Sequence, residues 1–237
     1  MKKLFISLSL LASVVSLFAQ DYTKYELDVN EFSELKVIDG INVDYVCNPD
    51  SAGKAVFYAT PDMASQIIFK PDKNKLEIQL VPKEERVNHE LPKVTVYSTY
   101  LTYAENDGDS LLRVLTVAPG PKFTAKVIGN GRLSVRNIKA SLVEGKLETG
   151  KGIIALYGSC NDARLNCTGT GQIQADGLAA KDVSCMILGT GTIGCNPSAT
   201  LTVKGGGSGT VYYVGKPEIK KKFSPGVKVK SIEEADK

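Results

Sequence analysis

Histidine and tryptophan are nearly absent from this chain of 237 residues, which contains one His and no Trp. A single imidazole, His89, cannot build a histidine-rich metal site, and a mechanism with two histidines would need a second copy of the chain. Aromatic residues make up only 7% of the sequence. The composition argues against most classes of metalloenzyme, and we expect no metal site and no cofactor.

Long apolar runs are missing after Gln20. Residues 1–20 combine two early lysines, an apolar stretch from Leu4 to Phe18 and a small residue, Ala19, before the expected cleavage point. This three-part pattern is typical of a secretory signal peptide, and the stretch is shorter than the ~20 residues that span a bilayer. We expect an exported protein, periplasmic, at the outer surface or secreted, with no integral membrane segment after cleavage.

A large excess of charge of one sign is also missing. The chain has 29 basic and 26 acidic residues, and loss of the two lysines in residues 1–20 leaves 27 against 26. This balance leaves almost no excess of positive charge to bind the phosphates of nucleic acid, so we expect no nucleic-acid partner. The one basic run falls in residues 216–237, which we predict to be a solvated C-terminal tail.

Glycine is present in ordinary number, 22 residues, but its placement is regular. Five Gly-x-Gly elements follow one another along the second half of the chain at a nearly constant period of roughly 20 residues. A repeat of this length indicates a stacked architecture in which each unit contacts its neighbours. The glycines are Gly129 and Gly131, Gly150 and Gly152, Gly169 and Gly171, Gly189 and Gly191, and Gly207 and Gly209.

Apolar residues keep a fixed phase relative to these glycines. Two and four residues after each second glycine stand apolar or small side chains, for example Ile173 and Ala175, with mostly polar or small residues between. This alternation is typical of a half-buried strand. We therefore predict an all-β fold, a parallel β-solenoid over residues 121–215, with glycines at corners where a Cβ does not fit. The second repeat is one residue longer, which indicates an inserted residue at its corner.

Residues 21–120 contain strand patterns without the glycine period. Two arrangements fit this half: irregular turns of one continuous solenoid, or a separate β-subdomain that caps the solenoid's open end. We favour the separate subdomain. The segment from Tyr103 to Ser110 is predicted to be a polar insertion in place of a strand.

The order of these features resembles the bacterial family known as the putative auto-transporter adhesin, head GIN domain. An export signal is followed by an early strand around Gly40-Ile41-Asn42 and then by serial Gly-x-Gly turns, so that the resemblance covers about residues 32–223. It implies a right-handed parallel β-helix similar in fold to pectin lyases, without a known catalytic apparatus. It also implies a role in cell-surface adhesion, which rests on structural analogy.

Five cysteines occur in the chain. Cys167, Cys185 and Cys195 fall in columns that face inward, so we expect them to be small buried hydrophobic residues. Cys47 and Cys160 lie near corners, and the sequence leaves the disulfide state of these two open.

Asp162 and Asp182 are candidates for chemistry because both stand seven residues before a Gly-x-Gly element. We expect them one turn apart, roughly 5 Å, a spacing that suits Ca²⁺ or the acid and nucleophile of a retaining glycosidase. At the same offset the neighbouring repeats have Lys122, Val143 and Thr200, so no third acid joins the pair. Two solvated carboxylates are the simpler interpretation, and we predict no catalytic residues.

Tyrosines supply the other candidate site. Tyr97, Tyr100 and Tyr103 lie within seven residues, and flat aromatic surfaces suit sugars or protein partners. We predict a non-catalytic adhesin or envelope binding module, with a glycan or a cell-surface protein as partner. Two alternatives stay open: a polysaccharide-active β-helix enzyme, and an envelope scaffold that assembles as a homo-oligomer.

Overall fold

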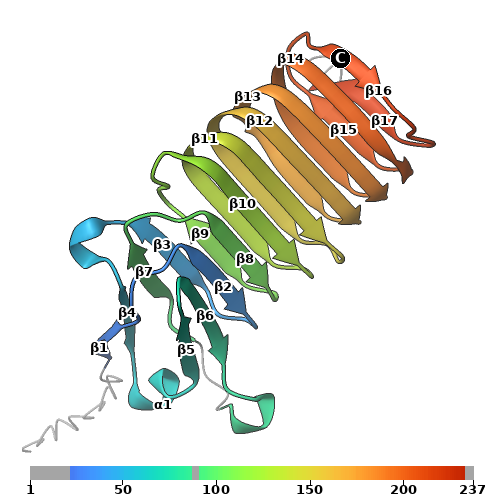
Figure 1. The fold of residues 1–237 in the computed structure, drawn as a ribbon. Coiled ribbons are helices and arrows are strands. Elements are labelled where there is room, and N and C mark those ends of the chain that lie inside the picture. Colours follow the sequence, from blue (N-terminus) through green and yellow to red (C-terminus); the bar gives the residue numbers. More distant parts are fainter. Residues whose placement is uncertain (1–21, 87–90, 233–237) are drawn as a thin grey trace, which may run out of the picture.

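The computed structural model describes residues 22–86 and 91–232, and it is almost entirely β, with 66% of residues in strands and 5% in helices. The strands form a β-solenoid of about six turns with an N-terminal strand subdomain (Figure 1), which confirms the predicted fold class. The expected signal peptide and His89 lie outside the described residues.

The regular turns pair in parallel, each with the next along the chain. Their inward positions form ladders of like side chains, for example Ile154, Ile173 and Ile193, all at most 1% exposed. Burial of these ladders is the main source of stability in such a repeat. The strands are β10 (Gly120–Ile128), β11 (Arg132–Glu148), β12 (Ile153–Gly169), β13 (Gln172–Gly189), β14 (Thr192–Gly207) and β15 (Thr210–Tyr213).

The Gly-x-Gly elements form the corners between successive turns. The first glycine of each element has a positive φ, from +71° at Gly150 to +127° at Gly189, where side chains with a Cβ are disfavoured. A Cβ on any second glycine would lie only 2.3–2.6 Å from an atom of the neighbouring turn. The longer second repeat has its extra residue at this corner, since Thr149 (φ +64°) precedes Gly150 and shifts the inward position to Leu147.

The N-terminal half contributes turns to the same solenoid, but in an order that differs from the chain order. The turn made by β2 (Glu34–Ile38) and β3 (Val43–Cys47) lies between two later turns, and it pairs in parallel with both. On one side are β6 (Lys75–Leu80) and β7 (Val94–Ser98), and on the other are β8 (Tyr103–Asp107) and β9 (Leu111–Val114). The sequence predicts that parallel stacking starts at residue 121. In the structure it starts well before that residue.

The remaining N-terminal elements form a cap. β1 (Thr23–Asp28) pairs antiparallel with β4 (Lys54–Ala59), β4 pairs antiparallel with β7, and β5 (Ile67–Asp72) pairs antiparallel with β6. Tyr25 and Phe57 stack at 5.2 Å between ring centroids, and Phe57 stacks on Phe69, which closes the core. Neither arrangement weighed from the sequence is complete, because this half is part solenoid and part cap. The short helices are α1 (Pro61–Ala64), η1 (Pro49–Ser51) and η2 (Lys83–Glu85).

Two segments differ from the sequence-based expectation. The polar segment from Tyr103 is the strand β8, because buried Glu105 and Asn106 both have partners: Glu105 pairs with lysines, and Asn106 Nδ2 donates to the carbonyl oxygens of Ser110 (2.7 Å) and Arg132 (2.9 Å). The described part of the predicted C-terminal tail, residues 216–232, is not a solvated tail, since it contains two paired strands.

The C-terminal segment forms the last turn of the solenoid. β16 (Glu218–Lys221) pairs in parallel with β14, and β17 (Lys228–Ser231) with β15. Ile219 lies in register with Leu201, and Val229 with Val211, so these two residues extend the inner ladders. Without this turn the ladders would end at side chains exposed to water, which explains why a lysine-rich segment folds here.

The cysteines lie largely where the repeat places them. Cys167, Cys185 and Cys195 are buried, as expected for their inward columns. Cys47 and Cys160 are half-buried, and all five thiols are free.

Candidate ligand-binding site

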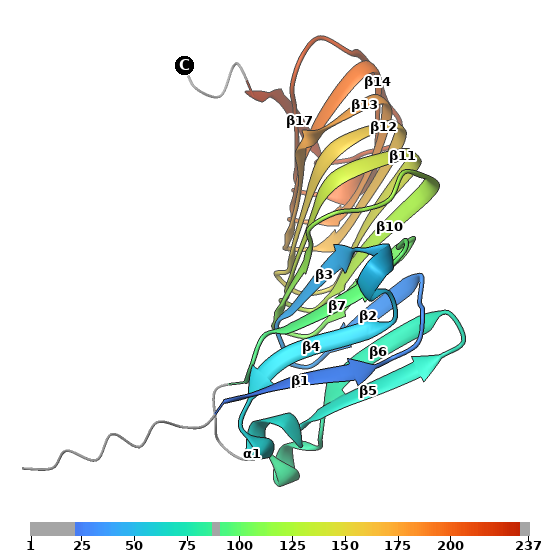
Figure 2. The ribbon, with the colours of Figure 1, turned by 90° about the vertical axis from the view of Figure 1, so that its left-hand side faces the viewer.

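The antiparallel strands β1, β4 and β7 lie side by side in the cap (Figure 2). Their outer face carries an unusual set of side chains. Along β4, alanines and Phe57 face the core, whereas Lys54, Val56 and Tyr58 point outward. In the register of the sheet, Lys24 of β1 stands opposite Tyr58, and Tyr97 of β7 stands opposite Lys54. The period of two residues along each strand therefore brings tyrosines and lysines from three chain segments onto one surface.

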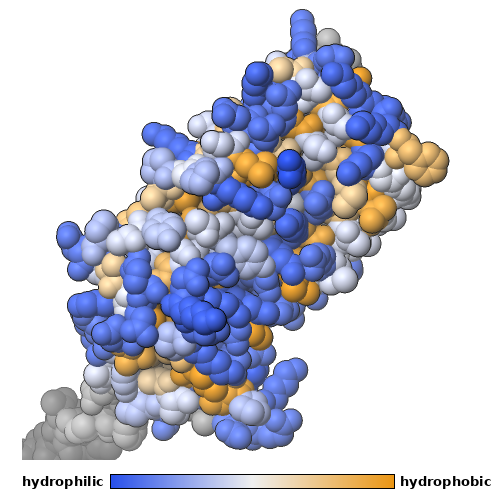
Figure 3. Space-filling model, viewed as in Figure 1, coloured by the Kyte–Doolittle hydropathy of each residue, from blue (hydrophilic) through white to orange (hydrophobic). Residues whose placement is uncertain are grey.

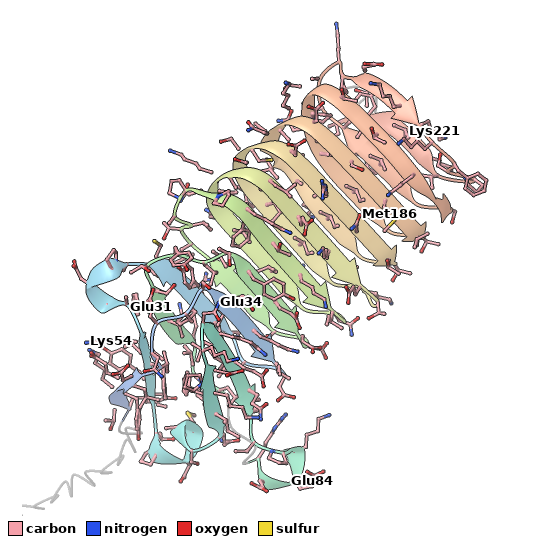
Figure 4. All side chains as sticks on the ribbon, in the orientation of Figure 1. Glu31, Glu34, Lys54, Glu84, Met186 and Lys221 are labelled. Atoms are coloured by element: carbon pink, nitrogen blue, oxygen red, sulfur yellow. The ribbon has the colours of Figure 1, made fainter. Side chains whose placement is uncertain are left out.

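These side chains surround an open hollow of about 490 Å³. Its aromatic members are Tyr58, which is 59% exposed, and Tyr97, which is partly buried. Figure 4 shows Lys54 on the outer side of β4, at the end of the molecule opposite Lys221. The complete lining is Lys24, Glu26, Ser51, Lys54, Val56, Phe57, Tyr58, Lys93, Thr95 and Tyr97.

Charge in the hollow is organised around Glu26. Its carboxylate accepts hydrogen bonds from Lys54 Nζ at 2.7 Å and Lys24 Nζ at 3.0 Å. These two bonds lower the pKa of Glu26 to about 2, and the bond to Glu26 raises the pKa of Lys24. The carboxylate is therefore charged at any pH where the protein is expected to work.

A second ion cluster lies beside the hollow, since Asp44 stands opposite Thr95 of the lining. Asp44 of β3 accepts hydrogen bonds from Arg113 Nε at 2.7 Å and Nη2 at 2.6 Å, and its carboxylate lies 3.1 Å from Lys93 Nζ. Burial opposes ionisation of Asp44, but the bonds from Arg113 and Lys93 outweigh it, and the pKa of Asp44 lies below its ordinary value. A bidentate guanidinium of this kind fixes both partners in place.

The three tyrosines singled out from the sequence do not form one surface. Tyr97 lines the hollow, and Tyr100 is 51% exposed in the connection between β7 and β8. Tyr103 is half-buried and donates a hydrogen bond to Glu105, beside a separate hollow of about 220 Å³. Burial and this bond raise the pKa of Tyr103 far above its ordinary value. Tyr58 could not be recognised from the sequence, since only the antiparallel pairing of β4 with β7 places it on the same face of the sheet as Tyr97.

Asp162 and Asp182 are neighbours in adjacent turns, in register on β12 and β13. The residue beside Asp162 in the preceding turn is Leu142, not Val143, because the inserted Thr149 shifts the count by one. Thr200 lies on the other side, and neither hollow described above is lined by either aspartate. In the described part of the chain, no group of three or more His, Cys, Asp or Glu side chains is placed to hold a metal ion.

Apolar side chains are scattered among polar ones over the face shown in Figure 3. Among residues 22–86 and 91–232, no helix is long and apolar enough to cross a membrane. Of the two hollows described above, the one on the cap is the larger, with about 490 Å³ against about 220 Å³.

Comparison with known proteins identifies the family. The family model for the putative auto-transporter adhesin, head GIN domain, matches residues 31–217. The chain belongs to this family. The hollow on the cap is therefore a feature of a head GIN domain protein. No curated protein matches the chain.

Solved structures share the fold of this head GIN domain protein. A putative adhesin from Bacteroides fragilis is 21% identical, with a TM-score of 0.74 over 90% of this chain and 98% of that one. A putative adhesin from Parabacteroides merdae is 19% identical, with a TM-score of 0.67 over 90% and 97%. A structure titled a putative lipid binding protein, from Parabacteroides distasonis, is 18% identical, with a TM-score of 0.66 over 90% and 98%. At these identities the likeness shows the fold alone.

Proposed function

We propose that this head GIN domain protein is an exported, non-catalytic adhesin that binds a glycan in the hollow between Tyr58 and Tyr97. The observation that carries the proposal is the exposure of Tyr58, 59%, in a hollow that Tyr97 and three lysines also line. Aromatic rings with polar neighbours combine apolar contact area with hydrogen bonding, which is what a sugar ring requires.

The geometry of the sheet supports a binding role for Tyr58 over a structural one. The neighbouring residue on β4, Phe57, is 3% exposed and packs in the core, whereas Tyr58 points away from it. Removal of an exposed side chain usually changes stability by less than about 0.5 kcal/mol. A loss of binding in a Tyr58 variant would therefore report on the site.

The proposal is tested by applying the purified protein to a glycan array. We expect Tyr58→Ala and Tyr97→Ala to lose most of the signal while their unfolding midpoints stay close to that of the original protein. Tyr157→Ala is the matched control, since Tyr157 is 42% exposed on β12 of the solenoid, outside the hollow. Binding that survives both cap substitutions, or an array with no signal at all, would overturn the proposal.

Two observations favour this function over the sequence-based alternatives. Asp162 and Asp182, the pair of carboxylates weighed as a catalytic candidate, have Leu142 and Thr200 as their neighbours along the column. The last turn ends in strands rich in lysine, which disfavours end-to-end assembly of a scaffold. Export is supported by the sequence of residues 1–20 and is tested by mass spectrometry of the mature N-terminus.

A further inference from the structure

The charges that line the cap hollow do not balance. Among the residues of the lining that the structure describes, three are lysines, Lys24, Lys54 and Lys93, and one is a carboxylate, Glu26. The lining therefore carries an excess of two positive charges, three minus one, in a chain whose basic and acidic residues are otherwise nearly equal in number. Charges of one sign gathered around an open hollow attract a ligand of the opposite sign.

The carboxylates near the hollow do not need all of these lysines. Glu26 is shared by two lysines, although one would neutralise it. Asp44 is already held at two points by Arg113, so Lys93 adds charge beyond what Asp44 requires. One further carboxylate, Asp28, stands opposite Lys54 in the register, but it lies outside the lining and accepts a hydrogen bond from the backbone N–H of Asn30 at 3.2 Å.

The positive groups flank the aromatic ones. In the sheet, Lys24 is directly opposite Tyr58, and Lys54 is directly opposite Tyr97. Directly opposite positions have Cβ atoms about 4.5–5.5 Å apart, so each tyrosine has a lysine side chain as its cross-strand neighbour. A sugar held against such a ring would present a negative substituent to the adjacent ammonium group.

From this arrangement we infer that the hollow selects an acidic glycan, a sugar chain that carries carboxylate or sulfate groups. The inference rests on the proposed glycan-binding function and adds the class of ligand. The ammonium groups supply ion pairs, and the tyrosine rings supply contact with the sugar.

The first test compares matched polysaccharides by isothermal titration of the full protein. Polygalacturonate and its carboxyl-reduced form share one backbone and differ in charge, and chondroitin sulfate against desulfated chondroitin separates sulfate from carboxylate. We expect affinity at least about tenfold higher for the charged member of one pair, and affinity that falls as salt rises because exposed charges are screened.

The second test uses a substitution that should increase binding. Glu26→Gln removes the carboxylate found among the described residues of the lining and releases both lysines, so we expect about fivefold tighter binding of the acidic glycan. Lys93→Gln should weaken binding by a similar factor, since Asp44 keeps its bond to Arg113. Lys204→Gln, at an exposed position on β14 of the solenoid, is the matched control and should leave affinity unchanged.

The outcomes separate the inference from the function on which it rests. Equal binding of polygalacturonate and its carboxyl-reduced form, together with equal binding of chondroitin sulfate and desulfated chondroitin, overturns the acidic preference and leaves glycan binding in place. No improvement in Glu26→Gln overturns the role assigned to the excess charge. Binding of none of the sugars overturns both.

Discussion

Single glycines decide whether successive turns can approach each other. At Gly171 a Cβ would lie 2.4 Å from the carbonyl oxygen of Gly152 and 2.9 Å from Leu147 Cδ2. The backbone oxygen cannot move without disturbing the parallel register, so the steric conflict has no inexpensive solution. This requirement is visible in the sequence, because every turn repeats it at the same position.

We expect Gly171→Ala to lower the free energy of unfolding by about 1–3 kcal/mol, the usual cost of overpacking. Thr190→Ala, at an exposed corner position, is the matched control and should change it by less than about 0.5 kcal/mol. Urea denaturation of both variants measures the difference. Equal midpoints would contradict the corner geometry.

At the scale of elements, the sequence predicts the regular turns better than the N-terminal ones. From β11 to β15 each strand pairs with the next one along the chain, so a local period reveals them. β2 pairs instead with β6 and β8, and no local pattern encodes that order. The candidate site is hard to predict from the sequence for the same reason. Tyr97 is recognisable as a candidate, but Tyr58 and Lys24 come from strands whose pairing is not local.

The strand β8 shows why polar composition misled the prediction. Glu105 is 6% exposed, and burial alone would raise the pKa of its carboxyl. The hydrogen bond from Tyr103 and the ion pairs with Lys36 (3.0 Å) and Lys126 (3.8 Å) outweigh burial and hold the pKa below its ordinary value. A buried strand can therefore contain an acid, provided that adjacent strands supply its partners.

This lowered pKa gives β8 a measurable pH dependence. A carboxyl whose pKa is lower in the folded than in the unfolded state adds stability above the unfolded value, about 4.3, and loses it as pH falls through the folded value. We expect Glu105→Gln to be less stable than the original protein at pH 7, and the difference in unfolding free energy to shrink by pH 3. Glu218→Gln, at a position exposed in β16, serves as the control. A difference at Glu105 that stays constant would contradict the ion-pair network.

At the scale of the whole molecule, the two ends of the solenoid are finished differently. The N-terminal end is covered by the cap, whereas β16 and β17 each pair on one side only among the described strands (Figure 1). Ile219 on this last turn is 42% exposed. The strands that form this edge contain Lys220, Lys221, Lys228 and Lys230, and lysine on an open edge opposes pairing with another chain.

We expect replacement of these four lysines by threonine to cause end-to-end self-association, because the edge would keep its unpaired backbone groups and lose its repulsion. Size-exclusion chromatography with light scattering at increasing concentration measures the effect. A variant with four exposed lysines replaced on the solenoid wall, Lys139, Lys151, Lys181 and Lys204, is the control and should keep the mass of the original protein. If the variant with threonine at these four positions of β16 and β17 stays monomeric, the lysines do not prevent self-association at this end.

The displaced position of the β2–β3 turn has a consequence for how the chain acquires its structure. Its partners in β8 and β9 come much later in the chain, with Leu35 opposite Ala104 and Val43 opposite Leu112. The β2–β3 turn is synthesised first. The backbone hydrogen bonds at its two edges can form only after much of the N-terminal half has been synthesised. Contacts of such sequence separation slow folding, whereas the later turns each need only the preceding one. We therefore expect the N-terminal half to form its contacts more slowly than the regular turns, which depend on local pairing.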